Sequence, residues 1–556
     1  MQLITLLKWL TFFALSINAI GMLTPIVNSG DSVTYAALSQ TIALHNDWAS
    51  LVLDGQDWLD KPHFPFWITA LFFKLGGISA FTYTLPGYLF YLIGGYYTYR
   101  MARWFYGREA AWLSLLVYVS VFHLMDTATG VKAEAYLMGS IMGACYYWLR
   151  FDTTPKLKYL LLGALFGGVS MMTKGLFTLV TIGGGLVCLW LYQKQWHKLW
   201  SPKWLLALGL TLLCTAPELI ALYWQFDAHP EKMVFGHDHV SGIRFFFWDS
   251  QFGRFFNSGP IKNPGGSPSY FVLVFLWAFL PWVAVFVAAL VDGVRKFRQR
   301  SAPERGHFVF LCGAFFVTFT MFSLAGFQLD YYTVIVYPFA AILCGKFLSE
   351  RLAMTSGQRP LMIAQMGITL LLLAMVLGFS IYVGHVVLLA VVATMLLVAA
   401  VFGYVYRAQT RLNVMLVFPV VGVTTLFTFL TLMATLTFMS VSVPYNANQL
   451  LRAQAPAPIY ALQMDIAARE LGLYNTSPSY AVEAVEALPT TGAPYYLLVR
   501  ATQLAQVSAA LGRVEPLGQG DWVVHKTGTL PYSLKLAKGI TGLEDIRLLR
   551  VVPLRP

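Results

Sequence analysis

The sequence predicts an α-helical membrane protein that crosses the bilayer many times and ends in a small α/β domain. Three observations support this fold class. Of the 556 residues, 57% are hydrophobic and only 12% are charged, whereas soluble proteins carry roughly 25% charged residues. Apolar runs of about 20 residues, the length that spans a bilayer, recur along most of the chain. These runs stop near residue 441, and a more polar tail follows.

The first apolar run covers about residues 7–27. We expect it to be a retained helix rather than a signal peptide, because no small-residue cleavage pattern follows it before Asn28. Later runs bring the expected total to about thirteen spans. They lie near residues 80–100, 110–128, 133–150, 157–173, 175–193, 203–225, 269–291, 307–327, 331–349, 361–383, 385–406 and 413–441.

Basic residues set the expected topology. The net charge of +12 could suggest a nucleic-acid partner, but Lys and Arg lie in short loops between spans rather than on one face of a soluble domain. Such loops stay in the cytoplasm. The first polar loop therefore faces outward, and an odd number of spans puts the tail on the same side. The basic loops alternate, at positions 100–108, 150–158, 194–203, 295–305, 351–359 and 407–411.

We therefore divide the chain into two domains. A transmembrane domain at 1–444 carries outward loops at about 28–79 and 227–268, and an outward α/β domain occupies 445–556. No repeat of fixed period is present.

Within the tail, helix-like stretches at Ile459–Leu473 and Ala501–Leu511 alternate with β-rich runs at Tyr495–Val499 and Trp522–His525. The five cysteines of the chain all lie in apolar segments and are expected to be small core residues, without disulfide or thiolate metal spacing: Cys145, Cys188, Cys214, Cys312 and Cys344.

The first outward loop concentrates ionisable groups beside the membrane, where such groups tend to mark function. Asp31 follows the first span, before an expected interfacial helix at Ser32–Leu44, and could simply cap that helix. Asp60 and Lys61 precede a proline; the lysine is suited to a phosphate, although a solvated loop pair is the plainer interpretation. An apolar segment at Phe64–Lys74 is too short to span and is expected to form a second interfacial helix.

Other ionisable residues are expected near the same depth. Lys132 and Glu134 begin the fourth span, where an acid is costly unless it is paired or functional. Arg254 lies in an aromatic stretch of the second outward loop and could clamp a phosphate, whereas the aromatic residues alone would form a membrane belt. The histidines nearby, His229, His237 and His239, fit no familiar zinc spacing, so solvated side chains are the favoured interpretation.

Several motifs, taken in order, resemble the C-type membrane glycosyltransferases, in particular the branch of the lipid A aminoarabinose transferases and protein O-mannosyltransferases. The resemblance covers most of the spanning region, and the length and outward tail are most similar to the aminoarabinose transferases. The motifs are Gly30-Asp31, Asp60-Lys61-Pro62, Thr173-Lys174-Gly175, Gly253-Arg254-Phe255, Leu280-Pro281-Trp282, Phe322-Ser323, Asp330-Tyr331-Tyr332 and Tyr337-Pro338.

The resemblance implies an inverting enzyme of the bacterial inner membrane that takes a sugar from a polyprenyl-phosphate donor, with its site and tail in the periplasm. The acceptor would be lipid A, another glycolipid or a protein. The chain would act as a monomer among membrane lipids, without nucleic acid and with no required cofactor. The implied catalytic residues are Asp31, Glu134 and Asp60, and the implied donor-phosphate residues are Lys61, Arg254, Tyr331 and Tyr332.

Two departures from the family pattern bear on specificity. Gln328 stands where aminoarabinose transferases tend to have lysine, and the stretch Asn257–Lys262 lacks a histidine commonly found there, so a divalent metal is not supported. A lipid or glycolipid flippase is the alternative from another class, with Glu218 after Pro217 as its best candidate group. A protein O-glycosyltransferase, or a polymerase or ligase of surface polysaccharide, would share the donor and differ in acceptor.

Overall fold

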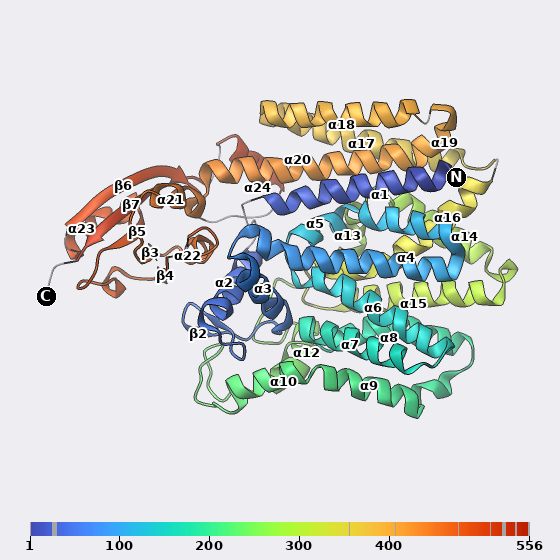
Figure 1. The fold of residues 1–556 in the computed structure, drawn as a ribbon, viewed down its shortest axis with the longest axis horizontal. Helices are drawn as coiled ribbons and strands as arrows, with labels where there is room; N and C mark the ends of the chain where they lie inside the picture. The colour runs from blue at the N-terminus through green and yellow to red at the C-terminus, as the bar shows by residue number, and fades with distance from the viewer. Residues whose placement is uncertain are drawn as a thin grey trace.

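A computed structural model describes residues 2–24, 30–354, 356–405, 407–475, 477–511, 513–524, 530–539 and 542–553. It confirms the predicted fold class: a bundle of apolar helices runs along the long axis of the molecule, and a small domain built on a sheet lies beyond one end (Figure 1). The helices of the bundle are α1 (Gln2–Ile20), α4 (Ala80–Val119), α5 (Phe122–Thr129), α6 (Ala133–Thr153), α7 (Leu157–Lys174), α8 (Phe177–Tyr192), α9 (Pro202–Cys214), α10 (Ala216–Leu222), α13 (Tyr270–Ala278), α14 (Val283–Arg295), α15 (Ala302–Leu324), α16 (Tyr337–Ala353), α17 (Arg359–Val383), α18 (Val386–Val405) and α20 (Phe418–Val441).

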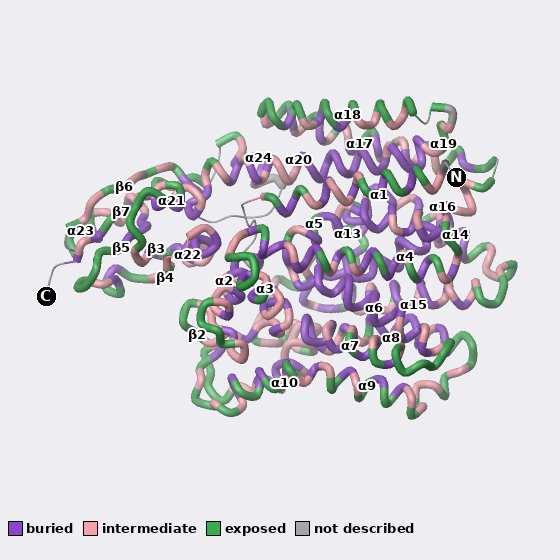
Figure 2. The backbone as a smooth tube through the Cα atoms, viewed as in Figure 1, coloured by how far each residue is buried: buried purple, intermediate pink, exposed green. Residues whose placement is uncertain are grey.

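Among the described residues, six helices are long and apolar enough to cross a membrane, or up to nine spans if each sharply bent pair counts as one. The expected total is about thirteen. Helices such as α6 and α7 are not among the six, and both carry ionisable side chains near their ends. Outer helices such as α17 and α18 expose apolar side chains, as expected for surfaces that face lipid (Figure 2).

The stretch predicted as one straight span at 269–291 is bent. It forms α13 and α14, whose axes differ by 113°. Pro281 lies in the break, and a proline cannot continue the hydrogen-bond ladder of a helix. The 40-residue α4 likewise contains a non-helical residue, Gly107 with φ 88°, so it is two helices in sequence.

The end of the bundle nearest the sheet is built from the first and second outward loops. The first contains α2 (Gly30–His45), the β1–β2 hairpin (Val52–Leu53 and Gln56–Asp57) and α3 (Phe64–Gly76). The expected helices at 32–44 and 64–74 are thereby confirmed. The second loop contains short helical turns, α11 (Gly242–Arg244), a π-helical turn (Phe245–Asp249) and α12 (Phe252–Phe255).

The C-terminal part contains a five-stranded sheet of order β4-β3-β5-β7-β6. Strands β3, β4 and β5 are parallel, and β7 pairs antiparallel with β5 and β6. Alternate residues of the central strands enter two separate apolar cores, one on each face. The elements are α21 (Val443–Leu451), β3 (Ile459–Leu462), α22 (Asp465–Leu471), β4 (Ser479–Val482), β5 (Tyr495–Arg500), α23 (Leu504–Ala510), β6 (Arg513–Trp522), α24 (Leu530–Ala537) and β7 (Glu544–Val552).

Two sequence predictions in this part need correction. The segment at 459–473, expected to be a helix, is a strand followed by a short helix. Its strand, Ile459–Leu462, lies in the sheet interior with both faces apolar. It therefore lacks the clean alternation of polar and apolar residues that would have identified it as a strand. The strand expected at 522–525 instead ends at Trp522, and His525 lies outside the described residues. The expected strand at Tyr495–Val499 and the helix within 501–511 are confirmed.

The sheet-bearing part is fastened to the first outward loop. Arg469 of α22 forms an ion pair with Asp54 at 2.6 Å, and the Gln40 amide of α2 donates to the Gly472 carbonyl at 3.2 Å. At the end of α20, the Val523 N–H donates to the Val441 carbonyl at 2.7 Å. The helix α2, which carries Asp31, is therefore held from the side of the tail.

Candidate active site

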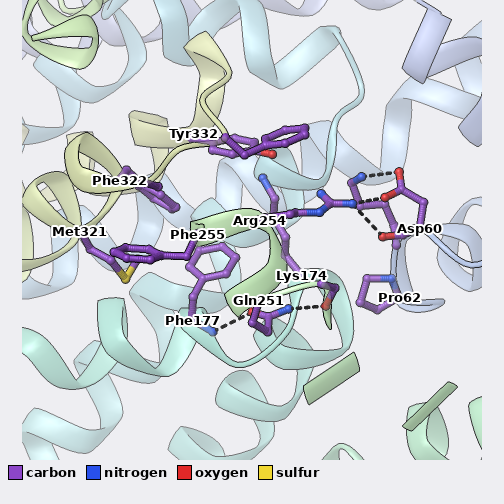
Figure 3. A pocket seen from close by; sticks show the side chains of 14 residues that line it. Asp60, Pro62, Lys174, Phe177, Gln251, Arg254, Phe255, Met321, Phe322 and Tyr332 are labelled. Carbon is purple, nitrogen blue, oxygen red and sulfur yellow. Dashed lines mark hydrogen bonds and ion pairs between the residues drawn. The ribbon is translucent and has the colours of Figure 1, made fainter. Parts of the chain in front are cut away.

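A cavity lies between the two outward loops and the ends of α7, α8 and α15 (Figure 3). It contains about 620 Å³ of atom-free space, a volume that includes the open solvent at its mouth. Its walls are largely aromatic and aliphatic, and its polar groups gather on one side. The lining residues are Asp60, Lys61, Pro62, Lys174, Phe177, Ser250, Gln251, Arg254, Phe255, Met321, Phe322, Ala325, Phe327 and Tyr332.

Two cations share one carboxylate at this cavity. Arg254 pairs with the Asp60 carboxylate and also donates to the Asp60 carbonyl at 3.3 Å, while Lys61 pairs with the other carboxylate oxygen (Figure 3). The formal charges of these three side chains sum to +1. The Arg254 guanidinium also lies 5.4 Å from the ring centre of Phe327, so an apolar wall supports it.

The three groups shift one another's pKa values. Burial favours the neutral form of Asp60, but Lys61 and Arg254 outweigh it and lower the pKa of that carboxyl. Burial and then Arg254 lower the pKa of Lys61, against the opposing effects of Asp60 and Asp31. Burial opposes the charge of Arg254, but the Asp60 carboxylate raises its pKa above the usual value. The site thus holds two adjacent cations without enough negative charge to balance them.

A second ion pair includes Lys174 of the cavity wall. Glu134, at the start of α6, pairs with Lys174, at the end of α7, and both side chains are almost fully buried. The Lys174 ammonium lies 3.9 Å from the ring centre of Tyr332 and 5.6 Å from that of Tyr331. This pair is formally neutral, so it leaves the excess positive charge on Lys61 and Arg254.

Asp31 lies in the first turn of α2 rather than before it, and its side chain is exposed. The Tyr331 hydroxyl donates to its carboxylate at 3.1 Å, and Lys132 lies 3.9 Å from the centre of the Tyr331 ring. Burial raises the pKa of Tyr35 well above its usual value, and the carboxylates of Asp31, Asp60 and Glu134 raise it further. The three predicted acids therefore converge on one buried side chain.

The turn between α7 and α8 contacts the second outward loop closely at the cavity. Gly175 has φ +90°, and a Cβ there would lie 2.2 Å from the Gln251 amide nitrogen. The Gln251 amide oxygen in turn accepts from the Phe177 N–H at 3.2 Å (Figure 3). Only glycine fits this turn, which explains the Lys174-Gly175 sequence at the end of α7.

Gln328, one of the two departures from the family pattern, does not line the cavity. Its amide oxygen accepts from the Ser267 N–H at 3.0 Å, and its amide nitrogen donates to the Phe322 and Ser323 carbonyls at 3.3 Å each. A lysine could not accept the first of these bonds. Gln328 therefore ties the second outward loop to the end of α15.

The loop histidines do not converge. His229 and His239 are exposed and face Glu231 and Asp238, respectively, and His237 is also exposed. No group of three or more His, Cys, Asp or Glu side chains suited to a metal ion occurs in the part of the chain that the structure describes.

The structure places the predicted residues in three neighbouring positions. Asp60, Lys61, Arg254 and Tyr332 line the cavity, Asp31 and Tyr331 lie together beside it, and Glu134 is paired with Lys174 of the cavity wall. Sequence reasoning did not assign Lys174 to the site, although a lysine at the end of an apolar run was a signal. Phe327 offered no such signal.

Comparison with known proteins gives this geometry a context. The family model for dolichyl-phosphate-mannose-protein mannosyltransferases matches residues 60–224. The undecaprenyl phosphate-alpha-4-amino-4-deoxy-L-arabinose arabinosyl transferase 2 of Proteus mirabilis is 26% identical over 57% of this chain and 54% of its own length. A Pseudomonas aeruginosa relative with the same activity name is 26% identical over 59% of this chain and 58% of its own. The chain thus spans about half the length of the curated relatives it matches.

The crystal structure of ArnT from Cupriavidus metallidurans bound to undecaprenyl phosphate superposes over 97% of both chains, with a TM-score of 0.72 and 18% identity. The chain therefore has the fold of this membrane glycosyltransferase. The resemblance inferred from the motifs is confirmed, and the family match begins at Asp60, in the cavity wall. The apolar helices and the similarity to bacterial transferases support a multi-pass protein of the bacterial inner membrane.

Proposed function

We propose that this protein transfers a sugar, with inversion, from a polyprenyl-phosphate donor to an acceptor at the periplasmic face of the inner membrane. One observation carries the proposal: Lys61 and Arg254 share a single carboxylate beside apolar cavity walls. The excess positive charge suits a phosphate, and the aromatic and aliphatic walls suit the first isoprene units attached to it. The donor named for its relatives has this chemistry.

The proposed reaction is a single displacement. An acceptor oxygen attacks the anomeric carbon and gives its proton to the Asp31 carboxylate, which Tyr331 orients through its hydrogen bond. The bond between the anomeric carbon and the phosphate oxygen breaks, and its electron pair leaves with the polyprenyl phosphate. Lys61 and Arg254 stabilise the negative charge that develops there. In this scheme Asp60 orients the two cations, and the neutral Glu134–Lys174 pair supports the cavity floor.

The distribution of charge supports a periplasmic site. The first outward loop and the sheet-bearing tail lie at one end of the bundle (Figure 1). Asp60, Lys61 and Pro62 of that loop line the cavity. The basic loops predicted to be cytoplasmic connect the other ends of the helices, for example at Arg295 and Arg351. We also propose that residues 1–444 and 445–556 act as catalytic and accessory domains, respectively.

The test uses purified protein with a radiolabelled polyprenyl-phosphate sugar and three acceptors: lipid A, a second glycolipid and a peptide. We expect transfer to one of them by the wild type and loss of transfer in Asp31→Asn with donor binding retained. The acceptor that becomes labelled distinguishes lipid from protein glycosylation. Labelled donor that crosses a vesicle membrane without transfer would instead indicate a flippase, and would overturn the proposal.

A further inference from the structure

The candidate group for a flippase, Glu218, has another role. Its side chain is fully buried near the break between α9 and α10, whose axes differ by 46°. One carboxylate oxygen accepts the His63 N–H at 2.8 Å, and the other lies 3.0 Å from His63 Nδ1. His63 stands two residues after Lys61. Both oxygens of the Glu218 carboxylate are therefore engaged by one residue of the first loop.

The His63 ring is equally enclosed. Its Nε2 is buried and makes no hydrogen bond to any described residue. A neutral ring protonated at Nδ1 fits these contacts, because it donates to Glu218 and leaves Nε2 with no hydrogen to satisfy. The carboxylate then accepts both of its hydrogen bonds from one residue of the first loop.

Gln225, on the same segment as Glu218, holds the first loop at Leu51 and Asp57, on the N-terminal side of His63. Its amide oxygen accepts from the Leu51 N–H at 3.0 Å, and its amide nitrogen donates to the Leu51 carbonyl at 2.9 Å and to Asp57 at 2.8 Å. It is also fully buried. Residues 51–63 are therefore attached at both ends to the segment that follows the helix break.

We infer that Glu218 and Gln225 form a clamp that positions Asp60 and Lys61 against Arg254 for the donor phosphate. This inference rests on the proposed function. Lys61 and Asp60 lie between the two attachment points, on a loop without regular secondary structure at that position. Because a misplacement of about 1 Å can cost about 100-fold in rate, such a loop requires fixed ends. Glu218 and Gln225 are positioning residues, because neither lines the cavity.

The first experiment compares Glu218→Ala, Glu218→Gln and Thr211→Ala in the full-length protein. Thr211 is the matched control: it is fully buried in the same bent helix pair, but its hydroxyl bonds only to the Ala207 carbonyl of its own helix. We expect E218A to lower kcat/KM for the donor about 100-fold, mainly through a higher KM for the donor. E218Q should lie between the wild type and E218A, because an amide keeps one acceptor oxygen. T211A should retain the wild-type KM.

A second measurement is independent of turnover. Hydrogen exchange followed by mass spectrometry should show faster exchange of residues 51–63 in E218A and in Gln225→Ala, and no change in T211A. Unchanged exchange in both clamp variants, or a loss of kcat at constant donor KM, would overturn the inference and leave the proposed function standing. If the wild type transfers no sugar at all, the proposed function fails, and the exchange result alone decides whether the clamp holds the loop.

Discussion

Arg254 should strengthen the binding of the donor phosphate mainly through its charge. Replacing it with glutamine removes one of two cations that share the Asp60 carboxylate and lowers the formal charge of the trio from +1 to 0. At about 4 Å and an effective dielectric constant of about 20, one such attraction is worth about 4 kcal/mol. Arg254 is 14% exposed and Lys61 remains, so we expect a loss of about 2–4 kcal/mol, or about 30- to 1,000-fold in affinity.

The assay is titration of detergent-solubilised protein with a short-chain polyprenyl phosphate. A double variant sharpens it: Asp60→Asn combined with Arg254→Gln restores a charge of +1 through Lys61 alone. We expect the double variant to bind at least about tenfold more tightly than R254Q, since the two residues are coupled. Binding by R254Q within threefold of the wild type, or a double variant weaker than R254Q, would refute the charge argument.

Three further outcomes follow from the geometry. Because the pKa of Lys61 lies below its usual value of 10.5, phosphate binding should fall as the pH rises, beginning below pH 10.5. In a binding titration, Lys61→Arg should move this decline to higher pH. Glu134→Gln leaves the Lys174 charge buried without its partner, so we expect a loss of about 3–5 kcal/mol of stability, measured as a lower melting temperature. The double variant Glu134→Gln with Lys174→Met should largely recover the melting temperature. Gly175→Ala places a Cβ against Gln251 at a positive φ and should cost about 1–3 kcal/mol; an unchanged melting temperature would contradict the fit described for this turn.

Local signals predicted most of the fold. Apolar runs and their flanking polar residues located α2 and α3 to within a few residues. The strand β3 was mistaken for a helix because both of its faces are buried, so it lacks the alternation of a half-exposed strand. The bend in 269–291 could have been predicted from Pro281.

The site was predictable only where chain topology is simple. Glu134 begins α6 and Lys174 ends α7, and consecutive antiparallel helices bring those two ends together. The pairing of Asp60 with Arg254 joins residues far apart in the chain, so no spacing rule indicates it; only the resemblance to the family brought the two together. The contact of His63 with Glu218 also depends on tertiary packing, so no sequence spacing indicates it.

The attachment of α22 to the first loop has a consequence for biogenesis. Gln40 meets Gly472, and Asp54 meets Arg469, so these contacts join parts of the chain more than 400 residues apart. A ribosome completes the N-terminal partners long before it synthesises the others. The helix that carries Asp31 can form these contacts only after α22 has been synthesised, and a protein truncated before residue 469 would lack both of them.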